Sequence, residues 1–346
     1  MSIRSGRVEA SEAKAGIEAY GALTGRRSAR IAALGALLSL AALFSLVVGS
    51  SSTGIMDVLR VGLDGVIFWE LRVPRVIMGL LVGSGLAVGG AVTQAVLRNP
   101  LASPFTLGVA SGAGFGAALG IVLAGAVSKW AVAGGAFSFA LITALFILGV
   151  ARMKSATPET LVLAGVAIMF LFSAGTSLLQ FLGTEQQIQS IVFWSFGNLS
   201  RASWTDILIA AGMILPALPA LFLRAWDLNL LLAGDEMAAS LGVRVERLRL
   251  TALLLAALMT AGAICFTGVI GFIGLVGPHV ARLMVGGDHR FLLPASALSG
   301  ALLVLVSDCL GRTLFAPHMV PIGIVTAFLG VPFFFGLLMR RKREFW

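Results

Sequence analysis

Long apolar segments without Asp, Glu, Lys or Arg recur along the whole chain. A transmembrane helix needs about 20 consecutive apolar residues to cross the hydrocarbon core of a bilayer. Most of the charge-free segments have room for one such helix: 31–50, 76–97, 99–128, 130–151, 160–184, 207–223, 291–307 and 313–339. The segment 250–281 is too long for one helix and long enough for two joined by a tight turn near Phe266-Thr267-Gly268. The pattern therefore predicts nine or ten transmembrane helices.

The distribution of Lys and Arg decides between these two counts. Cytoplasmic loops of membrane proteins carry an excess of Lys and Arg. Ten helices place both termini on one side together with 19 of the 25 cations, whereas nine helices give a split of 14 to 11. We therefore predict an all-α integral membrane protein, a polytopic bundle of about ten transmembrane helices with both termini in the cytoplasm. The outer side then keeps six cations: Arg60, Arg72, Arg75, Lys129, Arg201 and Arg312.

The chain divides into three parts by composition. Residues 1–30 are polar and mixed in charge, so we expect a cytoplasmic N-terminal tail that is solvated and poorly ordered. Residues 31–339 form the transmembrane domain, which contains a cytoplasmic loop at about 225–248. Residues 340–346 form a basic cytoplasmic C-terminus.

Composition excludes several classes of protein. Hydrophobic residues make up 58% of the chain and charged residues 12%, and the mean hydropathy is +0.98. A soluble domain is roughly 45–50% apolar and about 25% charged. An ordinary soluble enzyme, a disordered protein and a nucleic-acid binder are therefore excluded. The net charge of +9 comes from 25 Lys and Arg against 16 Asp and Glu, and the predicted topology places most of these cations on one side of the bilayer.

Glycine spacing indicates close helix packing. Gly108, Gly112, Gly116 and Gly120 recur every four residues, a spacing that puts small residues on one helix face and lets two backbones approach closely. Gly268, Gly271, Gly274 and Gly277 recur every three. A phosphate-binding loop needs the frame G-x-x-x-x-G-K-[ST], which this chain lacks. We therefore expect no ATP hydrolysis by the chain itself.

The sequence has few residues in the patterns that are typical of catalytic sites. His279, His289 and His318 are scattered, no metalloprotease or hydrolase motif occurs, and Cys265 and Cys309 have no metal-ligand spacing. An ion-coupled carrier normally keeps ionisable groups inside the membrane, and Asp308 at the end of the ninth predicted helix is the one candidate. An ion-coupled carrier and an intramembrane enzyme are thus disfavoured, and the energy source is expected to be external to the chain.

Several motifs, in consistent order from about Arg72 to Leu338, resemble the iron-chelate and cobalamin (FecCD-type) permease family of binding-protein-dependent ABC importers. These motifs are Arg72-Val73-Pro74-Arg75, the run Arg98-Asn99-Pro100-Leu101-Ala102-Ser103-Pro104, Leu107-Gly108-Val109-Ala110-Ser111-Gly112-Ala113, Leu163-Ala164-Gly165-Val166, the run from Gly271 to Arg282, and Val320-Pro321-Ile322-Gly323-Ile324-Val325-Thr326-Ala327. The resemblance implies the type II ABC importer permease fold.

The resemblance also implies an assembly in the bacterial inner membrane. A second copy of the chain would complete a homodimer, two ATP-binding cassette ATPase subunits would bind below, and one periplasmic or lipid-anchored solute-binding protein would bind above. ATP and Mg²⁺ would reside on the ATPase, with no cofactor or metal in this chain and no nucleic-acid partner. The implied substrate is an iron(III)-siderophore or similar metal chelate, with cobalamin and haem as alternatives.

The loop at about 225–248 resembles the family's coupling segment, two short helices with a Gly turn that contact the ATPase. The residues that carry this resemblance are Gly234, Asp235, Glu236, Ala239, Leu241, Gly242 and Val243. Asp235 and Glu236 suit a helix N-terminus and Gly242 suits a helix end. The alternative is an ordinary solvated connection.

On the outer face, Arg72 and Arg312 match family positions that form salt bridges to glutamates of the binding protein. Such exposed ion pairs contribute only about 0–1 kcal/mol each, so their role would be orientation more than affinity. The alternatives are that Arg72 snorkels to lipid headgroups and that Arg312 pairs with Asp308 on the same helix face.

Two further sets of residues follow from the resemblance. Asn99 and Leu101 match a cytoplasmic gate, although Pro100 also permits a purely structural turn. The family's second gate is not carried over, because Pro158 and Glu159 replace its small hydroxyl residues. The translocation path should be lined mainly by the fifth and tenth predicted helices, with Thr176, Ser177 and Gln180 as polar candidates or, alternatively, as helix-to-helix hydrogen-bond partners.

The outer loop before the last predicted helix holds His318 and Met319 side by side. Both residue types ligate haem iron, and both are also ordinary loop residues. The pair therefore does not identify a ligand.

Overall fold

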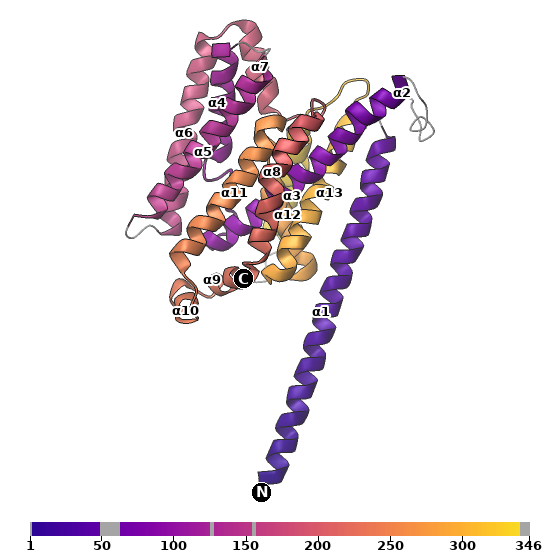
Figure 1. The fold of residues 1–346 in the computed structure, drawn as a ribbon, viewed down its shortest axis with the longest axis vertical. Coiled ribbons are helices and arrows are strands. Elements are labelled where there is room, and N and C mark those ends of the chain that lie inside the picture. Colours follow the sequence, from indigo (N-terminus) through magenta and orange to yellow (C-terminus); the bar gives the residue numbers. More distant parts are fainter. Residues whose placement is uncertain (1, 49–62, 125–127, 154–156, 340–346) are drawn as a thin grey trace.

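The computed structural model describes residues 2–48, 63–124, 128–153 and 157–339, with side chains for these ranges except 2–20, 63–64 and 337–338. All elements in the described residues are helices (Figure 1). Their bounds are α1 Ser2–Val47, α2 Leu63–Val66, the π-helical segment η2 Ile67–Arg72, α3 Val73–Leu97, α4 Val109–Ala124, α5 Lys129–Ala151, α6 Pro158–Leu182, α7 Glu185–Ser195, α8 Trp204–Phe222, α9 Ala225–Leu232, α10 Asp235–Ser240, α11 Val245–Thr267, α12 Ile273–Val285, α13 His289–Thr313 and α14 Ile322–Met339.

Each predicted transmembrane segment contains one apolar helix. Seven helices of the described residues are long and apolar enough to cross a membrane, namely α1 from Gly21 on, η2 with α3, α5, α6, α8, α11 and α13, and three shorter apolar helices are α4, α12 and α14. The long run 250–281 does hold two helices, because α11 ends at Thr267 and Gly268 follows it with a positive φ of 70°. The predicted turn near Phe266-Thr267-Gly268 is thereby confirmed.

The N-terminal tail is helical in the described residues. We predicted a poorly ordered segment over residues 1–30, but helix α1 begins at Ser2 and projects from the bundle as one continuous rod (Figure 1). Residues 2–30 contain no proline and many good helix formers, so the apolar helix that follows can propagate in the N-terminal direction. The described backbone of the tail is therefore helical, and the expectation of poor order stays a prediction.

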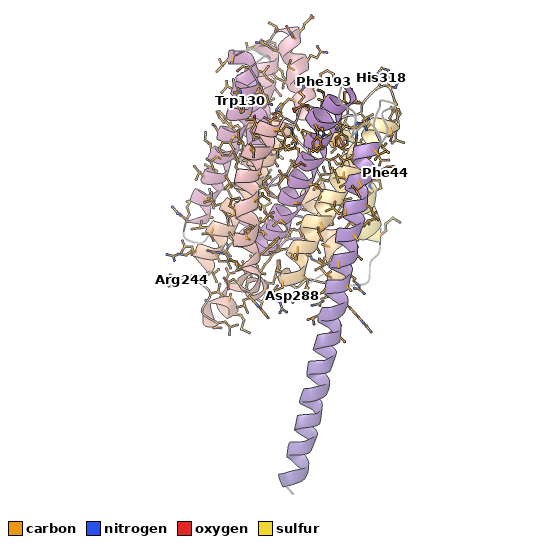
Figure 2. All side chains as sticks on the ribbon, turned by 45° about the vertical axis from the view of Figure 1, so that its right-hand side comes forward. Phe44, Trp130, Phe193, Arg244, Asp288 and His318 are labelled. Atoms are coloured by element: carbon orange, nitrogen blue, oxygen red, sulfur yellow. The ribbon has the colours of Figure 1, made fainter. Side chains whose placement is uncertain are left out.

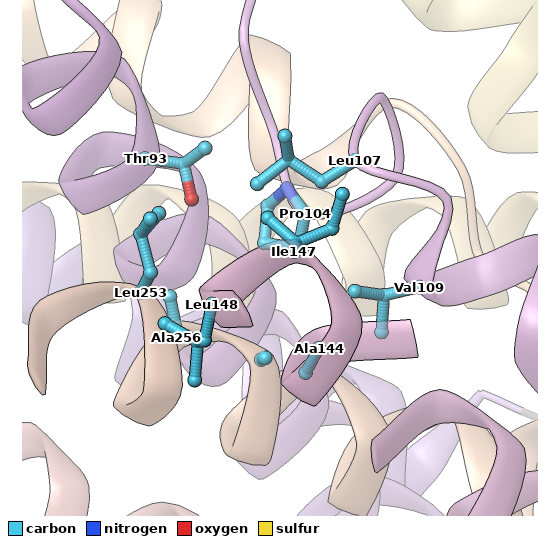
Figure 3. A pocket seen from close by; sticks show the side chains of 10 residues that line it. Thr93, Pro104, Leu107, Val109, Ala144, Ile147, Leu148, Leu253 and Ala256 are labelled. Atoms are coloured by element: carbon cyan, nitrogen blue, oxygen red, sulfur yellow. The ribbon is translucent and has the colours of Figure 1, made fainter. Parts of the chain in front are cut away.

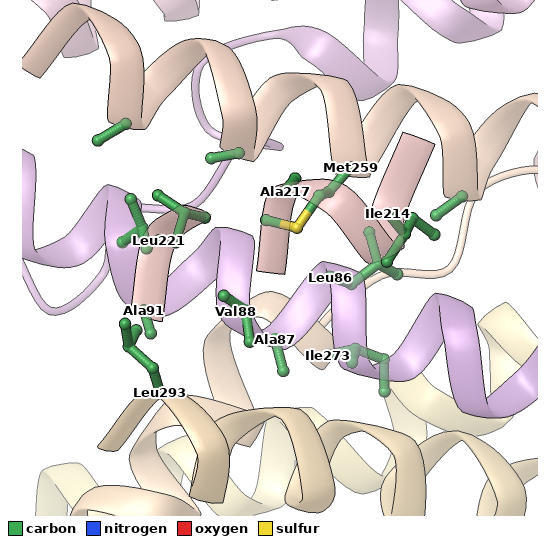
Figure 4. Close-up of a cluster of buried hydrophobic side chains, with 14 of the residues drawn as sticks. Leu86, Ala87, Val88, Ala91, Ile214, Ala217, Leu221, Met259, Ile273 and Leu293 are labelled. Atoms are coloured by element: carbon green, nitrogen blue, oxygen red, sulfur yellow. The ribbon is translucent and has the colours of Figure 1, made fainter. Parts of the chain in front are cut away.

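Helix α3 lies at the centre of the bundle and is buried on all sides. Leu86, Ala87, Val88 and Ala91 of α3 pack against side chains of α8, α11, α12 and α13 (Figure 4). A helix that is apolar all round is expected only where neighbours or lipid surround it completely. Here the neighbours are protein, which fixes α3 as the axis of the fold.

Glycines let other backbones approach α3 closely. A Cβ atom on Gly83 would overlap the backbone of Gly300 and Ala301 in α13, and a Cβ on Gly90 would overlap the carbonyl oxygen of Gly274 in α12. Small residues at such contacts allow the van der Waals packing that holds helices together in lipid. The α3 contacts with α12 and α13 therefore depend on these glycines.

The glycines spaced every four residues from Gly108 to Gly120 lie partly as predicted. Gly112, Gly116 and Gly120 of α4 all face the backbone of α5, as their spacing predicted. Gly108, however, precedes α4, has a positive φ of 82° and faces Gly165 of α6. Gly108 therefore belongs to a turn and not to the predicted helix face, because the chain needs a residue in the left-handed conformation before α4 can begin.

A small apolar space lies where α3, α5 and α11 meet. It has a volume of about 10 Å³ and is lined mainly by apolar side chains, among them Leu107, Ile147 and Ala256 (Figure 3). A cavity needs roughly 10–15 Å³ to hold even one water molecule, and the water also needs polar partners. This space is a packing defect and not a route for substrate.

Replacing Gly90 with alanine tests the packing of α3. We expect Gly90→Ala to lower the free energy of unfolding by about 1–3 kcal/mol, because the new methyl group must displace the Gly274 backbone. Gly134→Ala in α5 is the matched control, since no atom lies within 4 Å of its added Cβ. Thermal unfolding in detergent measures both variants, and an equal Tm for Gly90→Ala and wild type would contradict the packing argument.

Candidate functional site

An open cavity of about 630 Å³ lies along helix α6, between α6, α4 and the segment that joins α11 to α12. We call it the α6 cavity. None of the described residues that line it is charged. Its polar lining consists of hydroxyl groups and one amide: Ser103, Thr106, Ser111, Ser173, Thr176, Ser177, Gln180 and Ser195.

The α6 wall of this cavity is one face of the helix. Met169, Ser173, Thr176, Ser177 and Gln180 share a face because their spacing follows the helical repeat, and they extend over about 17 Å at 1.5 Å per residue. The Ser173 and Ser177 side chains are exposed in the middle of an apolar helix. Polar groups in such positions normally face protein or a water-filled cavity rather than lipid.

The predicted path residues are thus brought together by the structure. Thr176, Ser177 and Gln180 all line the α6 cavity. The Thr176 hydroxyl donates to the carbonyl oxygen of Phe172 one turn earlier, at 2.8 Å, which satisfies its proton within the helix. The hydroxyl oxygen is left to present a weak acceptor to the cavity.

The opposite wall of the α6 cavity is the break between α11 and α12. Val269, Gly271 and Phe272 line it, and Phe272 holds a left-handed φ of 67°. A non-glycine residue at positive φ carries strain that the surroundings must support. Phe272 packs beside Phe334 of α14, which fixes this wall to a further helix.

The predicted gate residues lie in the turn that ends α3. Arg98 closes the helix with a left-handed φ of 46°, and the Asn99 side-chain oxygen accepts a hydrogen bond from the Leu101 backbone N–H at 2.9 Å. This is the structural turn that the sequence also allowed. The Leu101 side chain is 56% exposed, and Ser103, two residues later, lines the α6 cavity.

The predicted coupling segment forms two short helices, α9 and α10, at the end of the bundle opposite α7 (Figure 1). Gly234 joins them at a positive φ of 114°, and Gly242 follows α10 at 88°. Ala238 is fully buried, whereas Glu236, Ala239, Leu241 and Gly242 are exposed and Val243 is half-buried.

Met237 joins this exposed surface, although the sequence alone did not single it out. It is 54% exposed and lies four residues before Leu241, which is 60% exposed. Two large apolar side chains one helical turn apart, on a polar end of the protein, are typical of a contact site for a partner.

Asp235 connects α10 to two other elements. One carboxylate oxygen accepts from Arg98 at 2.7 Å and the other from Arg249 of α11 at 2.9 Å. Arg98 is the residue directly before Asn99, so the coupling segment is bonded to the turn that holds the predicted gate residues. No pattern in the sequence indicated this contact, because Arg98 and Asp235 are 137 positions apart.

At the α7 end, Asp308 of α13 binds two arginines. It is 3% exposed, its carboxylate accepts from Arg75 of α3 at 2.7 Å, and it forms an ion pair with Arg312 at 3.1 Å. The pairing of Arg312 with Asp308 is the alternative that the sequence allowed, and Arg75 is a partner that the sequence analysis missed.

Arg72 and Arg312 are both buried and both donate to the C-terminal end of α1. Arg72 reaches the carbonyl oxygens of Leu46 and Val47 at 3.0 and 3.1 Å, and Arg312 reaches the carbonyl oxygen of Val48 at 2.9 Å. The last carbonyl groups of a helix have no partner within it and carry partial negative charge. The two predicted docking residues therefore cap α1 in this structure.

Asp288 lies at the α9 end of the bundle (Figure 2), where it caps α13 and joins three elements. It accepts from Arg290 at 2.6 Å and from Asn229 of α9 at 2.9 Å, and Arg27 of α1 lies 3.7 Å away. Partial burial alone would raise the pKa of Asp288, but the hydrogen bonds from Arg290 and Asn229 outweigh it and lower that pKa to about 2.

The fold and this site define a class of protein: a multi-pass helical membrane permease with an uncharged, hydroxyl-lined cavity and a pair of short helices at one end. The described residues form no strand.

Comparison with known proteins identifies the family. The profile of the FecCD transport family matches residues 37–340. The cobalamin import system permease BtuC of Halobacterium salinarum is 41% identical over 278 residues, which cover 80% of this chain and 74% of that protein. The hemin transport permease HmuU of Yersinia pestis is 39% identical over 282 residues, which cover 80% and 84%.

A solved structure supports the same family assignment. It is described as an inward-facing conformation of a metal-chelate type ABC transporter, and it matches with a TM-score of 0.82 at 33% identity over 90% of this chain and 98% of the other. The chain belongs to the FecCD transport family. It is the permease subunit of an ABC importer, and in such systems ATP hydrolysis resides on a separate subunit.

The pH dependence of stability tests the Asp288 cluster. A carboxyl whose pKa falls from 3.8 to about 2 on folding stabilises the native state at neutral pH, and that contribution is lost as the pH falls from about 4 through 2. We therefore expect wild type to be more stable than Asp288→Asn at pH 7, with the difference shrinking between pH 4 and pH 2.

Thermal unfolding at several pH values measures this difference, with Asp227→Asn on α9 as a nearby control. A difference between wild type and Asp288→Asn that stays constant from pH 7 to pH 2 would contradict the assigned bonds.

Proposed function

We propose that this permease carries an iron(III)-siderophore or a similar metal chelate into the cytoplasm by ATP-driven alternating access. The observation that carries the proposal is the α6 cavity, which is large, open on one side and free of charged lining. A path of weak hydroxyl contacts lets a bulky ligand enter and leave, because no single group binds it strongly. Affinity would then reside in a separate solute-binding protein.

The substrate class follows from the relatives. Proteins at 35–41% identity carry names for hemin, cobalamin and iron(III)-citrate import, all large metal complexes. The cavity volume of about 630 Å³ falls in the range of 300–1,000 Å³ typical of ligand sites. Cobalamin and haem are the alternative substrates within the same machinery.

We infer that two copies of the chain enclose the path. The polar face of α6 is exposed in the single chain, which would be costly against lipid, and a second copy would cover it. The open side of the α6 cavity would then become the interior of a homodimer.

The orientation follows from the distribution of charge. The exposed α9–α10 surface and most of the Lys and Arg residues lie at one end, which we assign to the cytoplasm together with both termini. Two ATPase subunits carrying ATP and Mg²⁺ would bind at α9 and α10, and one solute-binding protein would bind at the α7 end. The membrane would be the bacterial inner membrane.

The bonds of Asp235 suggest how ATPase movement reaches the gate. A displacement of α10 pulls on Arg98 through Asp235, and Arg98 sets the conformation of the turn with Asn99 and Leu101. Arg249 holds the same carboxylate and so transmits the displacement to α11, and the segment that follows the far end of α11 forms a wall of the α6 cavity.

An ion-coupled carrier is the second candidate and is less well supported. Asp308 is the acidic group that the sequence offered for a proton or sodium relay, but two arginines hold it. A carboxylate fixed in this way serves the structure rather than a relay.

Reconstituted uptake tests the proposal. Proteoliposomes that contain the permease, its ATPase and its binding protein should accumulate radioactive iron chelate only when ATP is present. The permease alone should show no uptake under a proton or sodium gradient. Gradient-driven uptake by the lone chain would contradict the proposal.

Replacing Asp235 tests the coupling. Asp235→Ala should lower ATP-driven uptake at least tenfold while the assembled complex still hydrolyses ATP, because the link from α10 to Arg98 and Arg249 is lost. Glu246→Ala on the exposed start of α11 is the matched control, and equal losses in both variants would contradict a specific role for Asp235.

Charge reversal tests the docking residues. Arg72→Glu with Arg312→Glu should abolish uptake with the native binding protein. Both residues also cap α1, so thermal unfolding of the double variant must be measured beside uptake. Normal uptake by a folded double variant would contradict docking, and a loss of uptake that merely tracks unfolding would assign both residues to α1 alone.

A further inference from the structure

A second cavity, of about 560 Å³, lies at the α7 end of the molecule. We call it the outer cavity. The start of α5, one side of α7, residues 197–201 and the end of α11 enclose it. It is separate from the α6 cavity, because Trp194 and Gly268 line the outer cavity whereas Ser195 and Val269 line the α6 cavity. The two spaces therefore lie on either side of the same backbone segments.

The lining of the outer cavity differs in chemistry from that of the α6 cavity. It contains two cations, several amides and aromatic rings, and none of its described lining residues is acidic. These groups are Lys129, Arg201, Gln186, Gln189, Asn198, Phe193, Trp194 and Phe266. Phe193 and Trp130 mark this end of the molecule in Figure 2.

The two cations are not equivalent. The Lys129 ammonium lies 2.6 Å from a carboxylate oxygen of Asp206, which is 1% exposed, so its charge is compensated within the protein. Arg201 is exposed, and within the described residues no carboxylate lies within ion-pair distance of it. Its guanidinium group keeps its full charge and its donors for a ligand.

The other arginines at this end are already engaged. Arg75 and Arg312 bind Asp308, and Arg72 binds the end of α1. Among the described residues at the α7 end, Arg201 is thus the arginine whose charge is directed to a cavity and not to another part of the chain.

We propose that the outer cavity is a receiving site for the anionic groups of the metal chelate, with Arg201 donating to a carboxylate or phenolate oxygen and Phe193 and Trp194 packing against its apolar parts. This inference rests on the proposed function. The α6 cavity has no charged lining and cannot discriminate by charge, so selection of anionic over neutral chelates falls to the outer cavity. An arginine suits this role because it binds a carboxylate through two parallel hydrogen bonds.

Equilibrium dialysis of the purified full-length permease in uncharged lipid nanodiscs tests the site without ATPase or binding protein. The probes are radioactive iron(III)-citrate, which is anionic, and tris(acetohydroxamato)iron(III), which is neutral. Wild type should bind iron(III)-citrate more tightly than the neutral chelate, and added salt should weaken only the former.

Three variants distinguish the loss of the Arg201 charge from an unspecific loss of binding. Arg201→Ala should raise the Kd for iron(III)-citrate at least tenfold and leave that of the neutral chelate unchanged, because bonds to a charged ligand are lost. Arg201→Lys should give an intermediate Kd, since it keeps the charge and loses the two-point geometry. Arg152→Ala, an exposed arginine at the opposite end of α5, should bind like wild type.

Several outcomes would overturn the proposal. Absence of iron(III)-citrate binding to wild type, equal binding of the two chelates, or an unchanged Kd in Arg201→Ala would each do so. The dialysis is repeated in nanodiscs that contain anionic lipid, where a loss of iron(III)-citrate binding that excess chelate cannot reverse would assign the site to a lipid headgroup instead.

These failures are distinguishable from failure of the proposed function. The dialysis experiment needs no transport, whereas the proposed function is decided by ATP-driven uptake in proteoliposomes. A permease that imports chelate while Arg201→Ala binds it normally would refute only the outer site.

Discussion

The central position of helix α3, which is fully buried from Gly85 to Leu97, is the constraint on which the rest of the structure depends. Its glycines bring the backbones of α12 and α13 into contact, so α3 cannot rotate or slide without displacing both. The two ends of α3 carry groups that belong to the proposed docking and coupling sites. Arg72 and Arg75 at its start hold α1 and Asp308, and Arg98 at its end holds Asp235. A rigid axis thereby connects the two faces of the membrane.

In the part of the chain that the structure describes, charged side chains lie toward the ends of the bundle, and four aspartates each join two or more elements there. Asp308 and Asp206 do this at the α7 end, and Asp235 and Asp288 at the α9 end. Lipid cannot solvate such groups, so they occur where protein partners or water can satisfy them. The middle of the path is left uncharged, which suits a permease that receives its energy from a separate ATPase.

Much of the fold could be predicted from the sequence, because the membrane imposes a simple rule of length and charge. Charge-free runs and the asymmetry of Lys and Arg located each apolar helix, including the two within 250–281. The predicted path residues Thr176, Ser177 and Gln180 also fall on one cavity wall. Local spacing along a single helix is enough for such a prediction.

Contacts between distant segments could not be predicted in this way. The bonds of Asp235 to Arg98 and of Asp308 to Arg75 join residues more than 100 positions apart, and no local pattern encodes them. The continuation of α1 to Ser2 was missed for a different reason, since polar composition alone does not distinguish a solvated helix from a solvated coil. Gly108 was assigned to a helix face although a turn requires it, because spacing does not reveal the sign of φ.

The most direct test of the account is the aqueous accessibility of the α6 cavity. A single cysteine at Ser177 in a background without Cys265 and Cys309 should react with a membrane-impermeant thiol reagent in the assembled transporter, and ATP should change its rate of labelling. A cysteine at Leu171, exposed on the opposite face of α6, should resist the reagent. Equal labelling at both positions, or no labelling at Ser177 in any state, would contradict a path along α6.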